Sequence, residues 1–335
     1  MSWILTTDSI DPYINAATEE YLLKKFDAKN EPIIYLWRND NTIVIGRNQN
    51  PLKEINLALV QQDKVNLFRR FSGGGTVYHD LGNLNYTFID KTKINQPNNY
   101  SVLAKPIIAF LNSLGVNAEF KGRNDLEIDG KKISGNAQYV YQDKLLHHGT
   151  LLFNLNSNKL AKYLNVDLSK IQAKGIDSIR KRVANIYDYL PNKEDWTIEK
   201  FVQALTNWFI ENDKAKPIIL DLEAKAFIND RAKNHFSTWT WNYGQLDEST
   251  FFNKKRFQGG EIELYLKIEN GLIKQINFMG DFLSIKEVSE IEEKLKNSRY
   301  ELNEIKALLN TFDITDYFGK ITCDEILNLM FNNGI

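Results

Sequence analysis

Three consecutive glycines, Gly73–Gly75, form the stretch of this sequence best suited to binding a ligand. They follow an alternating apolar segment that predicts a strand, and without Cβ atoms their backbone N–H groups can approach a bound group closely. Arg70, just before them, carries a planar guanidinium that suits a phosphate or a carboxylate. No Gly-Lys-Ser/Thr follows, and the next predicted element is a strand, which excludes the P-loop and the dinucleotide-binding fingerprint. The loop alone fits a ligand cradle or an ordinary surface loop equally well.

A short hairpin is predicted to bring a carboxylate and an ammonium together. Its Asp129-Gly130 turn is typical of two-residue hairpins and fixes the register. The expected pairs are Ile128 with Lys131, Glu127 with Lys132, Leu126 with Ile133 and Asp125 with Ser134. Because side chains alternate across a strand, Leu126, Ile128 and Ile133 should face a core, and Asp125, Glu127, Lys132 and Ser134 should share a polar face. Such a face can hold a metal ion and a phosphate together. The alternative is a solvated face with an ordinary Glu127–Lys132 pair, worth about 0.2–1 kcal/mol.

The remaining residues with chemical potential give weaker signals. The four histidines show neither HExxH nor carboxylate-flanked spacing. His147 and His148 are adjacent on a predicted strand and should point to opposite faces. Cys323 is the single cysteine, which excludes a disulfide framework and cysteine-based metal modules. It lies in a predicted helix far from the glycines, and we expect a buried, small apolar residue.

The helices and strands that must position these residues are predicted from the sequence pattern. Over residues 1–246 they indicate a large α/β domain with a mixed sheet. Asp11-Pro12 predicts a helix start, with Asp11 as the cap and Pro12 in the first helical position. Pro106 implies a kink or a late start in a helix that ends before Gly115. The other predicted strands are 33–37, 42–46, 65–71, 84–88 and 151–153, and the predicted helices are 102–114, 159–164 and 197–210.

The sequence pattern changes after the polar stretch 244–250, and residues 247–335 predict a small α+β domain. Alternating apolar residues lead into Asn270-Gly271, the strongest short hairpin signal, and a strand follows over 272–278. Helical periodicity follows over 285–295 and 302–309. Thr322 and Glu325 form a capping box for a last helix.

Length and composition agree with a chain of about two domains at about 150 residues each. The 335 residues are 43% hydrophobic and carry a net charge of −1, so a dedicated nucleic-acid-binding protein, which usually has a basic excess, is not expected. No apolar run approaches the ~18 residues that a membrane span needs. The first basic residue is Lys24, so no signal-peptide n-region precedes an apolar stretch. We expect a cytoplasmic protein with no membrane partner.

Taken together and in this order, the motifs resemble those of the lipoate–protein ligases nearly end to end. The block Arg69–Asn83 and the Lys-Ile-Ser-Gly run at 132–135 are highly specific in combination. The other segments that carry the resemblance are 35–39, 122–125, 132–137, 147–151, 174–183 and 241–244. The resemblance implies the mixed-sheet fold of the biotin/lipoate ligases. It also implies that residues 247–335 form the small accessory domain of the two-domain ligases. Because this unit is separate and joined by a polar segment, we expect it to act as a lid, and a fixed buttress is the alternative.

The resemblance implies an ATP-dependent enzyme of protein lipoylation and lipoate salvage. Such an enzyme converts free lipoate to lipoyl-adenylate, releases pyrophosphate and transfers the lipoyl group to a lysine of a lipoyl-acceptor domain. ATP and Mg²⁺ are then cosubstrate and metal, and no tightly bound prosthetic group is expected. The implied acceptors are the glycine-cleavage H-protein and the acyltransferase subunits of 2-oxoacid dehydrogenases.

The resemblance also assigns residues to roles. Lys132 is the implied catalytic residue, placed between the lipoate carbonyl and the α-phosphate, and Asp125 the implied Mg²⁺ ligand. The implied ATP-binding residues are Arg70, Gly75, Thr76, Val77, Tyr78, Asn83, Asn124, Asp125 and Lys132. The implied lipoate-binding residues are Arg70, Ser72, Gly73, Gly74, Gly75, His79, Lys132, Gly135, Ala137, His148 and Thr150.

Four alternatives stay open at this point. An octanoyl- or lipoyltransferase of the same superfamily would use a cysteine nucleophile, and Cys323 lies outside the block of motifs. A lipoyltransferase could use preformed lipoyl-AMP without making it. A biotin ligase would need its own glycine–arginine motif, which is absent. A non-catalytic lipoate- or acceptor-binding protein would have no need of Arg70, Asp125 and Lys132 together.

Overall fold

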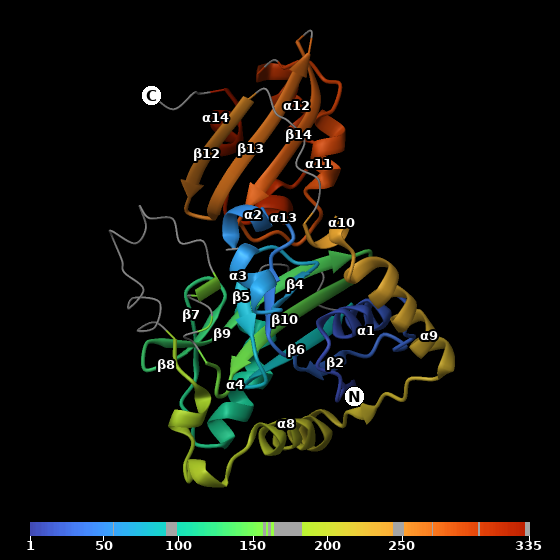
Figure 1. The fold of residues 1–335 in the computed structure, drawn as a ribbon, viewed down its shortest axis with the longest axis vertical. Helices are drawn as coiled ribbons and strands as arrows, with labels where there is room; N and C mark the ends of the chain where they lie inside the picture. The colour runs from blue at the N-terminus through green and yellow to red at the C-terminus, as the bar shows by residue number, and fades with distance from the viewer. Residues whose placement is uncertain are drawn as a thin grey trace.

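The computed structural model describes residues 1–55, 57–91, 99–156, 159, 162–163, 183–243, 251–269, 271–300 and 302–331, and every structural statement below concerns these residues. They form a large domain and, above it in Figure 1, a small C-terminal domain with its own sheet. The expected division between residues 246 and 247 falls in 244–250, outside the described residues.

The large domain is built on a mixed eight-stranded sheet, which confirms the predicted fold class. Its order is β11-β1-β2-β6-β10-β9-β8-β7. Strands β11, β1 and β2 run parallel, and each neighbouring pair from β2 to β7 is antiparallel. The strands are β1 Trp3–Thr6, β2 Ile33–Trp37, β6 Asn83–Asp90, β7 Glu119–Lys121, β8 Asp125–Ile128, β9 Lys131–Tyr141, β10 Lys144–Leu152 and β11 Lys216–Pro217.

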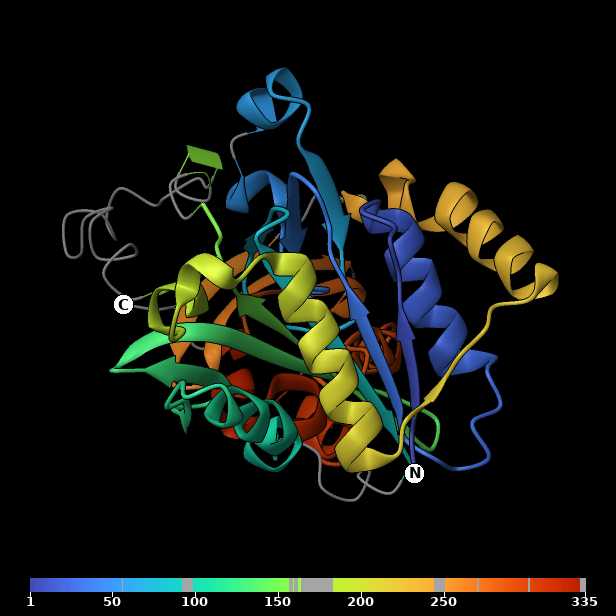
Figure 2. The same cartoon turned by 90° about the horizontal axis from the view of Figure 1, so that it is seen from below.

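Helices cover both faces of this sheet because its strands are apolar on both sides. In β2, Ile34 and Leu36 pack into the core under α4 (Tyr100–Ser113) and α8 (Ile198–Asp213). The alternate residues Ile33, Tyr35 and Trp37 pack into a second core with α1 (Pro12–Lys24) and α9 (Leu222–Arg231). Figure 2 shows α4 and α8 together on one side of the sheet and α1 and α9 on the other.

A small three-stranded sheet, β4-β3-β5, lies on the α1 side and carries the glycine loop. Its strands are β3 Thr42–Ile45, β4 Asn66–Arg69 and β5 Val77–His79. Strand β3 pairs in parallel with β4 and antiparallel with β5, and Gly73–Gly75 connects β4 to β5. The short helices α2 (Pro51–Glu54) and α3 (Leu57–Gln62) lie between β3 and β4. The strand predicted before the loop is confirmed as β4. The strand predicted after it, over 84–88, is confirmed as β6, and β5, which lies between them, was not predicted.

Several predicted element boundaries are confirmed, and two need correction. The Asp11 carboxylate caps α1 by accepting from the backbone N–H groups of Tyr13 and Ile14. Helix α4 does not start late: it begins at Tyr100 and contains Pro106. The strand expected over 151–153 is the end of the longer β10, and the helix expected over 159–164 lies largely outside the described residues.

The small domain is an antiparallel sheet, β12-β13-β14, covered by helices. The predicted hairpin joins β13 (Gly260–Glu269) to β14 (Leu272–Gly280), and β12 (Phe251–Phe257) was not predicted. The helices are α11 Ser289–Leu295, α12 Leu302–Leu309, α13 Ile314–Phe318 and α14 Cys323–Phe331. The capping box of α14 is confirmed, since the Thr322 backbone N–H donates to Glu325 and the Glu325 N–H donates to the Thr322 hydroxyl. Cys323 is half-buried and less enclosed than expected.

No described helix combines the length and the apolar character that crossing a membrane requires.

Candidate functional site

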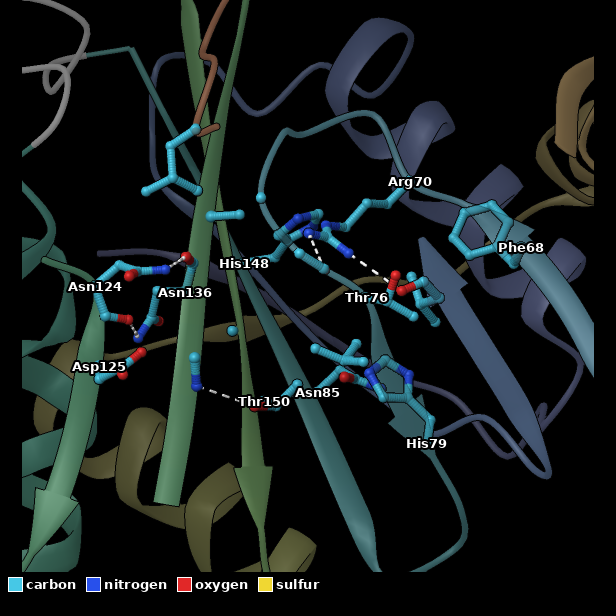
Figure 3. Close-up of a pocket in the computed structure, with 18 of the residues that line it drawn as sticks. Phe68, Arg70, Thr76, His79, Asn85, Asn124, Asp125, Asn136, His148 and Thr150 are labelled. Carbon is cyan, nitrogen blue, oxygen red and sulfur yellow. Dashed lines mark hydrogen bonds between the residues drawn. The ribbon is translucent and has the colours of Figure 1, made fainter. Parts of the chain in front are cut away.

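A cavity of about 550 Å³ lies between the large sheet, the small sheet and helix α1. The segment 281–283 of the small domain closes part of it, because Asp281 and Leu283 line the cavity. Figure 3 shows the polar side chains converging from β5, β6, β8, β9 and β10. One part of the wall is apolar, formed by Ala16, Trp37, Val44 and Phe68. The cavity therefore offers both an apolar slot and a polar end.

A β-bulge in the predicted hairpin brings Lys132 to the cavity. The turn is as expected, with positive φ at both Asp129 and Gly130, and Glu127 pairs with Lys132. Beyond this pair the predicted register is wrong: Leu126 pairs with Ser134 instead of Ile133, and Asp125 with Gly135 instead of Ser134. Ile133 is the extra residue of the bulge, and bulges re-aim neighbouring side chains.

The consequence of the bulge is a different polar face from the one predicted. Ser134 is fully buried with Leu126 instead of standing beside Lys132. Lys132 now shares the cavity face with Gly135 and Ala137. Its ammonium Nζ lies 2.8 Å from Oδ1 of Asp125. A Cβ at position 135 would lie 2.8 Å from the same Nζ, so the glycine leaves room for the ammonium.

Asn136 holds the turn before β8 against β9 and so fixes where Asp125 lies. Its backbone N–H donates to the Asn124 carbonyl at 2.9 Å, and its side-chain amide donates to the same oxygen at 3.0 Å. In return the Asn124 side chain donates to the Asn136 carbonyl at 2.5 Å. This pair of amides is visible beside Asp125 in Figure 3.

Arg70 organises the glycine loop. Its guanidinium Nη2 donates to the carbonyls of Gly73 and Gly75, each at 2.8 Å, and its Nε donates to the Ser72 hydroxyl at 3.2 Å. Burial lowers its pKa to about 10, with the Tyr100 and Glu19 charges opposing the shift, so the side chain stays a cation at neutral pH. Most of its N–H donors are thus committed to its own loop in this arrangement.

The three glycines have different surroundings. Gly73 and Gly74 direct their backbone N–H groups at the small domain, donating to the carbonyls of Ser284 (3.4 Å) and Phe282 (3.0 Å). Gly74 has φ +92°, and a Cβ there would meet Leu283 at 2.9 Å. Gly75 has no atom within 4 Å of an added Cβ. Only at Gly75 would an added side chain meet no neighbour, whereas Gly73 and Gly74 pack against the small domain, with Gly74 also lining the cavity.

A chain of buried hydrogen bonds runs from helix α1 to Arg70. The Glu19 carboxylate accepts from the Thr87 hydroxyl at 2.7 Å and lies 3.0 Å from Nδ1 of His148. Nε2 of His148 lies 2.6 Å from the Ser72 hydroxyl, which accepts from Arg70. Placing the imidazole proton on Nδ1 lets Ser72 donate to Nε2 and leaves no hydroxyl unpaired. His148 thus links Glu19 to the arginine that shapes the glycine loop.

His79 and Asn85 present unpaired polar atoms beside the apolar wall. Nε2 of His79 and the amide nitrogen of Asn85 are buried and have no hydrogen-bond partner among the described residues. Burial, with smaller contributions from Arg70 and His148, lowers the pKa of His79 to about 3, so the ring is neutral. The Asn39 amide lies 3.4 Å from Nδ1, which leaves Nε2 as an N–H donor. Both residues line the cavity, so both donors are available to a ligand.

Most of the predicted site residues line this one cavity. They are Arg70, Gly74, Gly75, Thr76, Val77, His79, Asn124, Asp125, Lys132, Gly135, Ala137, His148 and Thr150. Four others do not reach its surface. Ser72 is buried behind His148, and Gly73 packs on Ser284. The Tyr78 hydroxyl donates to Asn41, and Asn83 lies buried and donates to Asn85. His147 faces away from the cavity, as the strand alternation predicted, and contacts Gln138 and Asn136.

Sequence reasoning missed several residues that line the cavity. Arg123 stands directly before Asn124 in the segment 122–125 that carries the resemblance, so its place in the sequence is a usable signal. Glu19 had none, because a glutamate in a helix is ordinarily solvated. The remaining missed residues are Ala16, Trp37, Val44, Phe68, Asn85, Asn136, Gly149, Asp281 and Leu283.

Comparison with known proteins gives a consistent result along the chain. A family model described as the lipoyl protein ligase A/B catalytic domain matches residues 11–210, and one described as the bacterial lipoate protein ligase C-terminus matches residues 247–330. The chain is 47% identical to the probable lipoate-protein ligase A of Mycoplasma genitalium over 337 residues, covering 99% of each chain.

Solved structures similar to this one include three ligases. Plasmodium falciparum LipL1 in complex with lipoate has a TM-score of 0.78 at 29% identity, over 93% of this chain and 95% of that one. A bipartite lipoate protein ligase with its E2 lipoyl domain, from Thermoplasma acidophilum, has a TM-score of 0.64 at 26% identity, over 75% and 99%. A lipoate-protein ligase A bound with ATP has a TM-score of 0.59 at 25% identity, over 73% and 99%.

Proposed function

This chain belongs to the lipoate–protein ligase A family and is an ATP-dependent lipoate–protein ligase, and from that premise we propose how its cavity activates lipoate and transfers it. The observation that carries the proposal is the contact between Lys132 and Asp125, 2.8 Å apart, in the wall of a cavity that also has an apolar slot. The slot accepts the lipoyl chain and ring, and the polar end accepts the carboxylate and the ATP phosphates.

In the first half-reaction a lipoate carboxylate oxygen bonds to the α-phosphorus of ATP. The bond from that phosphorus to the oxygen bridging the β-phosphorus breaks, and pyrophosphate leaves with the electron pair. Negative charge concentrates on the α-phosphate oxygens during this step, and the Lys132 ammonium stabilises it. Fixed donors of this kind are commonly worth roughly 10²–10³-fold in rate.

In the second half-reaction the amine of an acceptor lysine attacks the lipoyl carbonyl. An amide forms, the carbonyl–phosphate bond breaks, AMP leaves and the amine releases a proton. Until the acceptor arrives, water must be kept from the mixed anhydride. Trp37 and Phe68 wall the slot on the large-domain side, and Leu283 of the small domain closes it beside Gly74.

Asp125 fits the role of Mg²⁺ ligand. Its carboxylate lines the cavity. The buried Oδ1 atom forms an ion pair with Lys132 but has no partner in hydrogen-bonding geometry. The described residues contain no cluster of three or more acidic, histidine or cysteine side chains able to hold a metal. One carboxylate suits Mg²⁺, which commonly takes one or two carboxylates and completes its shell with phosphate oxygens and water. When bound there, the ion would neutralise phosphate charge.

The acceptors we propose are lipoyl domains of 2-oxoacid dehydrogenase acyltransferase subunits and the glycine-cleavage H-protein. One of the similar structures is described as a ligase and its E2 lipoyl domain, which supports this class of partner. We also propose that the chain divides at 246/247 and that residues 247–335 act as a lid. Asp281 and Leu283 already stand in the cavity wall, which supports that role.

A cysteine-based transfer has no support in the cavity lining. Cys323 is on α14 and its Sγ contacts Asn310, also in the small domain. A transferase that uses only preformed lipoyl-AMP is the second candidate, and the Asp125–Lys132 contact favours adenylation over it.

The proposal is tested by incubating the protein with ATP, Mg²⁺, lipoate and an acceptor domain. Mass spectrometry should show a gain of one lipoyl group on the acceptor, and pyrophosphate should form only when lipoate is present. Lipoylation from supplied lipoyl-AMP without any from ATP would leave only the transferase.

A further inference from the structure

A second cavity, of about 370 Å³, lies beside the first between the two domains. It opens between the start of α4 and strand β7 of the large domain and helix α13 of the small domain. Arg123 and Leu283 line both cavities, so the two are neighbours across these side chains. The remaining lining residues are Asn99, Tyr100, Ser101, Phe120, Gly122, Thr315, Gly319 and Lys320.

The charge of this cavity is positive. Arg123 and Lys320 line it, and no carboxylate stands among its described lining residues. The Arg123 guanidinium donates to the backbone carbonyl of Gly259, and neither cation has a carboxylate partner in the described part of the chain. Two cations without counter-charges on one concave surface attract a multiply charged anion.

Tyr100 adds a buried donor without a partner. The residue is 3% exposed, and its hydroxyl has no hydrogen-bond partner among the described residues. Burial raises the Tyr100 pKa, outweighing the opposing charges of Arg123 and Arg70, so the hydroxyl keeps its proton. Leaving such a buried group unpaired costs about 1–3 kcal/mol, and a bound acceptor would remove that cost.

Tyr100 is also the first residue of the 14-residue helix α4, whose N-cap Asn99 makes no side-chain capping bond. The first N–H groups of a helix favour negative charge. The unpaired hydroxyl, the helix terminus and the two cations are separate features, and all of them suit an anion.

The position of the cavity identifies the anion. The α-phosphorus of ATP must lie near Lys132 and Asp125, and Arg123 stands two residues before Asp125 at the boundary between the cavities. Pyrophosphate, leaving with the electron pair of the broken bond, needs cations on its way out. Arg70 is committed to the carbonyls of Gly73 and Gly75, whereas Arg123 and Lys320 face the second cavity.

We propose that the second cavity receives the pyrophosphate released by adenylation and holds it through Arg123, Lys320 and the Tyr100 hydroxyl. The inference rests on the proposed adenylation, and it assigns an exit site to the product of that step.

The test is lipoate-dependent exchange of labelled pyrophosphate into ATP by the full-length protein with Mg²⁺. Lys320→Ala should raise the KM for pyrophosphate about threefold and Lys320→Glu about tenfold, as expected for losing and reversing one exposed charge near a bound polyanion. Tyr100→Phe should raise the same KM. In each variant the change should exceed any change in the KM for lipoate.

Lys294→Ala is the matched control, because Lys294 is an exposed lysine of α11 that lines neither cavity. Its KM for pyrophosphate should equal that of the wild type. If Lys320→Glu and Tyr100→Phe both showed exchange at the wild-type rate with an unaltered KM for pyrophosphate, the exit site would be overturned and the proposed adenylation would stand. Absence of lipoate-dependent exchange in the wild type would overturn both.

Discussion

Replacing Glu19 by glutamine tests whether the buried hydrogen-bond chain positions the glycine loop for catalysis. The carboxylate interacts with the Thr87 hydroxyl at 2.7 Å and with His148 at 3.0 Å. Glu19→Gln keeps the size of the side chain and removes the charge. With a neutral amide in place of the carboxylate, His148 is held less firmly, and its contact to Ser72, and through Ser72 to Arg70, loosens.

The expected size follows from the two interactions. A hydrogen bond to a charged group contributes about 1.5–3 kcal/mol and a neutral one about 1 kcal/mol, so the change costs about 1 kcal/mol for each bond. If between half and all of the resulting ~2 kcal/mol is felt in the transition state, kcat/KM for lipoate falls roughly 5- to 30-fold. The free energy of unfolding should fall by no more than about 2 kcal/mol, because the side chain still fills its site.

The neighbouring Glu20 provides a matched control. It is 2% exposed and equally paired, but with Arg231 and Lys24, outside the cavity lining. Glu20→Gln should lower the free energy of unfolding by about 1–3 kcal/mol and leave kcat/KM unchanged in the folded protein. Steady-state lipoylation and chemical denaturation of both variants measure the two effects. Equal kcat/KM for Glu19→Gln and wild type, or equal losses of kcat/KM in both variants, would refute the positioning role.

Three further predictions follow from the site and its surroundings. Lys132→Ala should keep the wild-type melting temperature and reduce adenylation roughly 10²–10³-fold, and Lys132→Arg should also fail because a planar fork cannot replace a compact ammonium; wild-type pyrophosphate release by either would remove Lys132 from the mechanism. Gly75→Val should weaken lipoate binding measured by calorimetry but change the melting temperature little, because nothing lies within 4 Å of an added Cβ there. Gly74→Ala should lower the melting temperature, because Gly74 has a φ of +92° and an added Cβ would contact Leu283. A lower melting temperature in Gly75→Val with unchanged lipoate binding would show that Gly75 is structural. Burial alone would raise the pKa of Glu20, but hydrogen bonds from Arg231 and Lys24 outweigh burial and lower the pKa. The stability that Glu20 contributes should therefore be complete above the unfolded-state pKa of about 4.3 and vanish as the pH falls through the folded-state pKa. If the free energy of unfolding of the wild type exceeded that of Glu20→Gln by more as the pH fell, the pairing would be contradicted.

Local patterns were enough to predict the elements that carry the site. The Asp11 cap, the strands predicted over 65–71 and 84–88, the Asp129-Gly130 turn and the Thr322 capping box depend on residues close in sequence, and all are confirmed. The bulge at Ile133 has no such local signal. The bulge moves Ser134 into the core beside Leu126, and it moves Lys132 onto the cavity face. Packing across the whole sheet determines this arrangement.

The parts of the site that could not be predicted are contacts between distant segments. Glu19 meets His148 across 129 residues, and nothing near either residue in the sequence indicates the partner. The role of Arg70 was expected from its chemistry to be ligand binding, but the carbonyls it holds belong to its own loop, which only the folded backbone reveals. The residue types therefore indicate which chemistry each side chain can perform, but not which distant residues it contacts in the folded structure.

The same long-range contacts link the small domain to the reaction. The N–H groups of Gly73 and Gly74, expected to cradle a ligand, donate to carbonyls of Ser284 and Phe282. Around them, Asn48 donates to the Ser284 hydroxyl at 2.9 Å and Arg47 pairs with Glu287 at 2.7 Å. A ligand that needs those two N–H groups must first displace the segment that carries Leu283 into the cavity. Because each backbone hydrogen bond contributes only about 1 kcal/mol net, a ligand that makes equivalent bonds can offset their loss. A ligand and the small domain therefore compete for the same two N–H groups of the glycine loop. A ligand that binds these groups releases the small-domain segment, and docking of that segment weakens ligand binding to the loop.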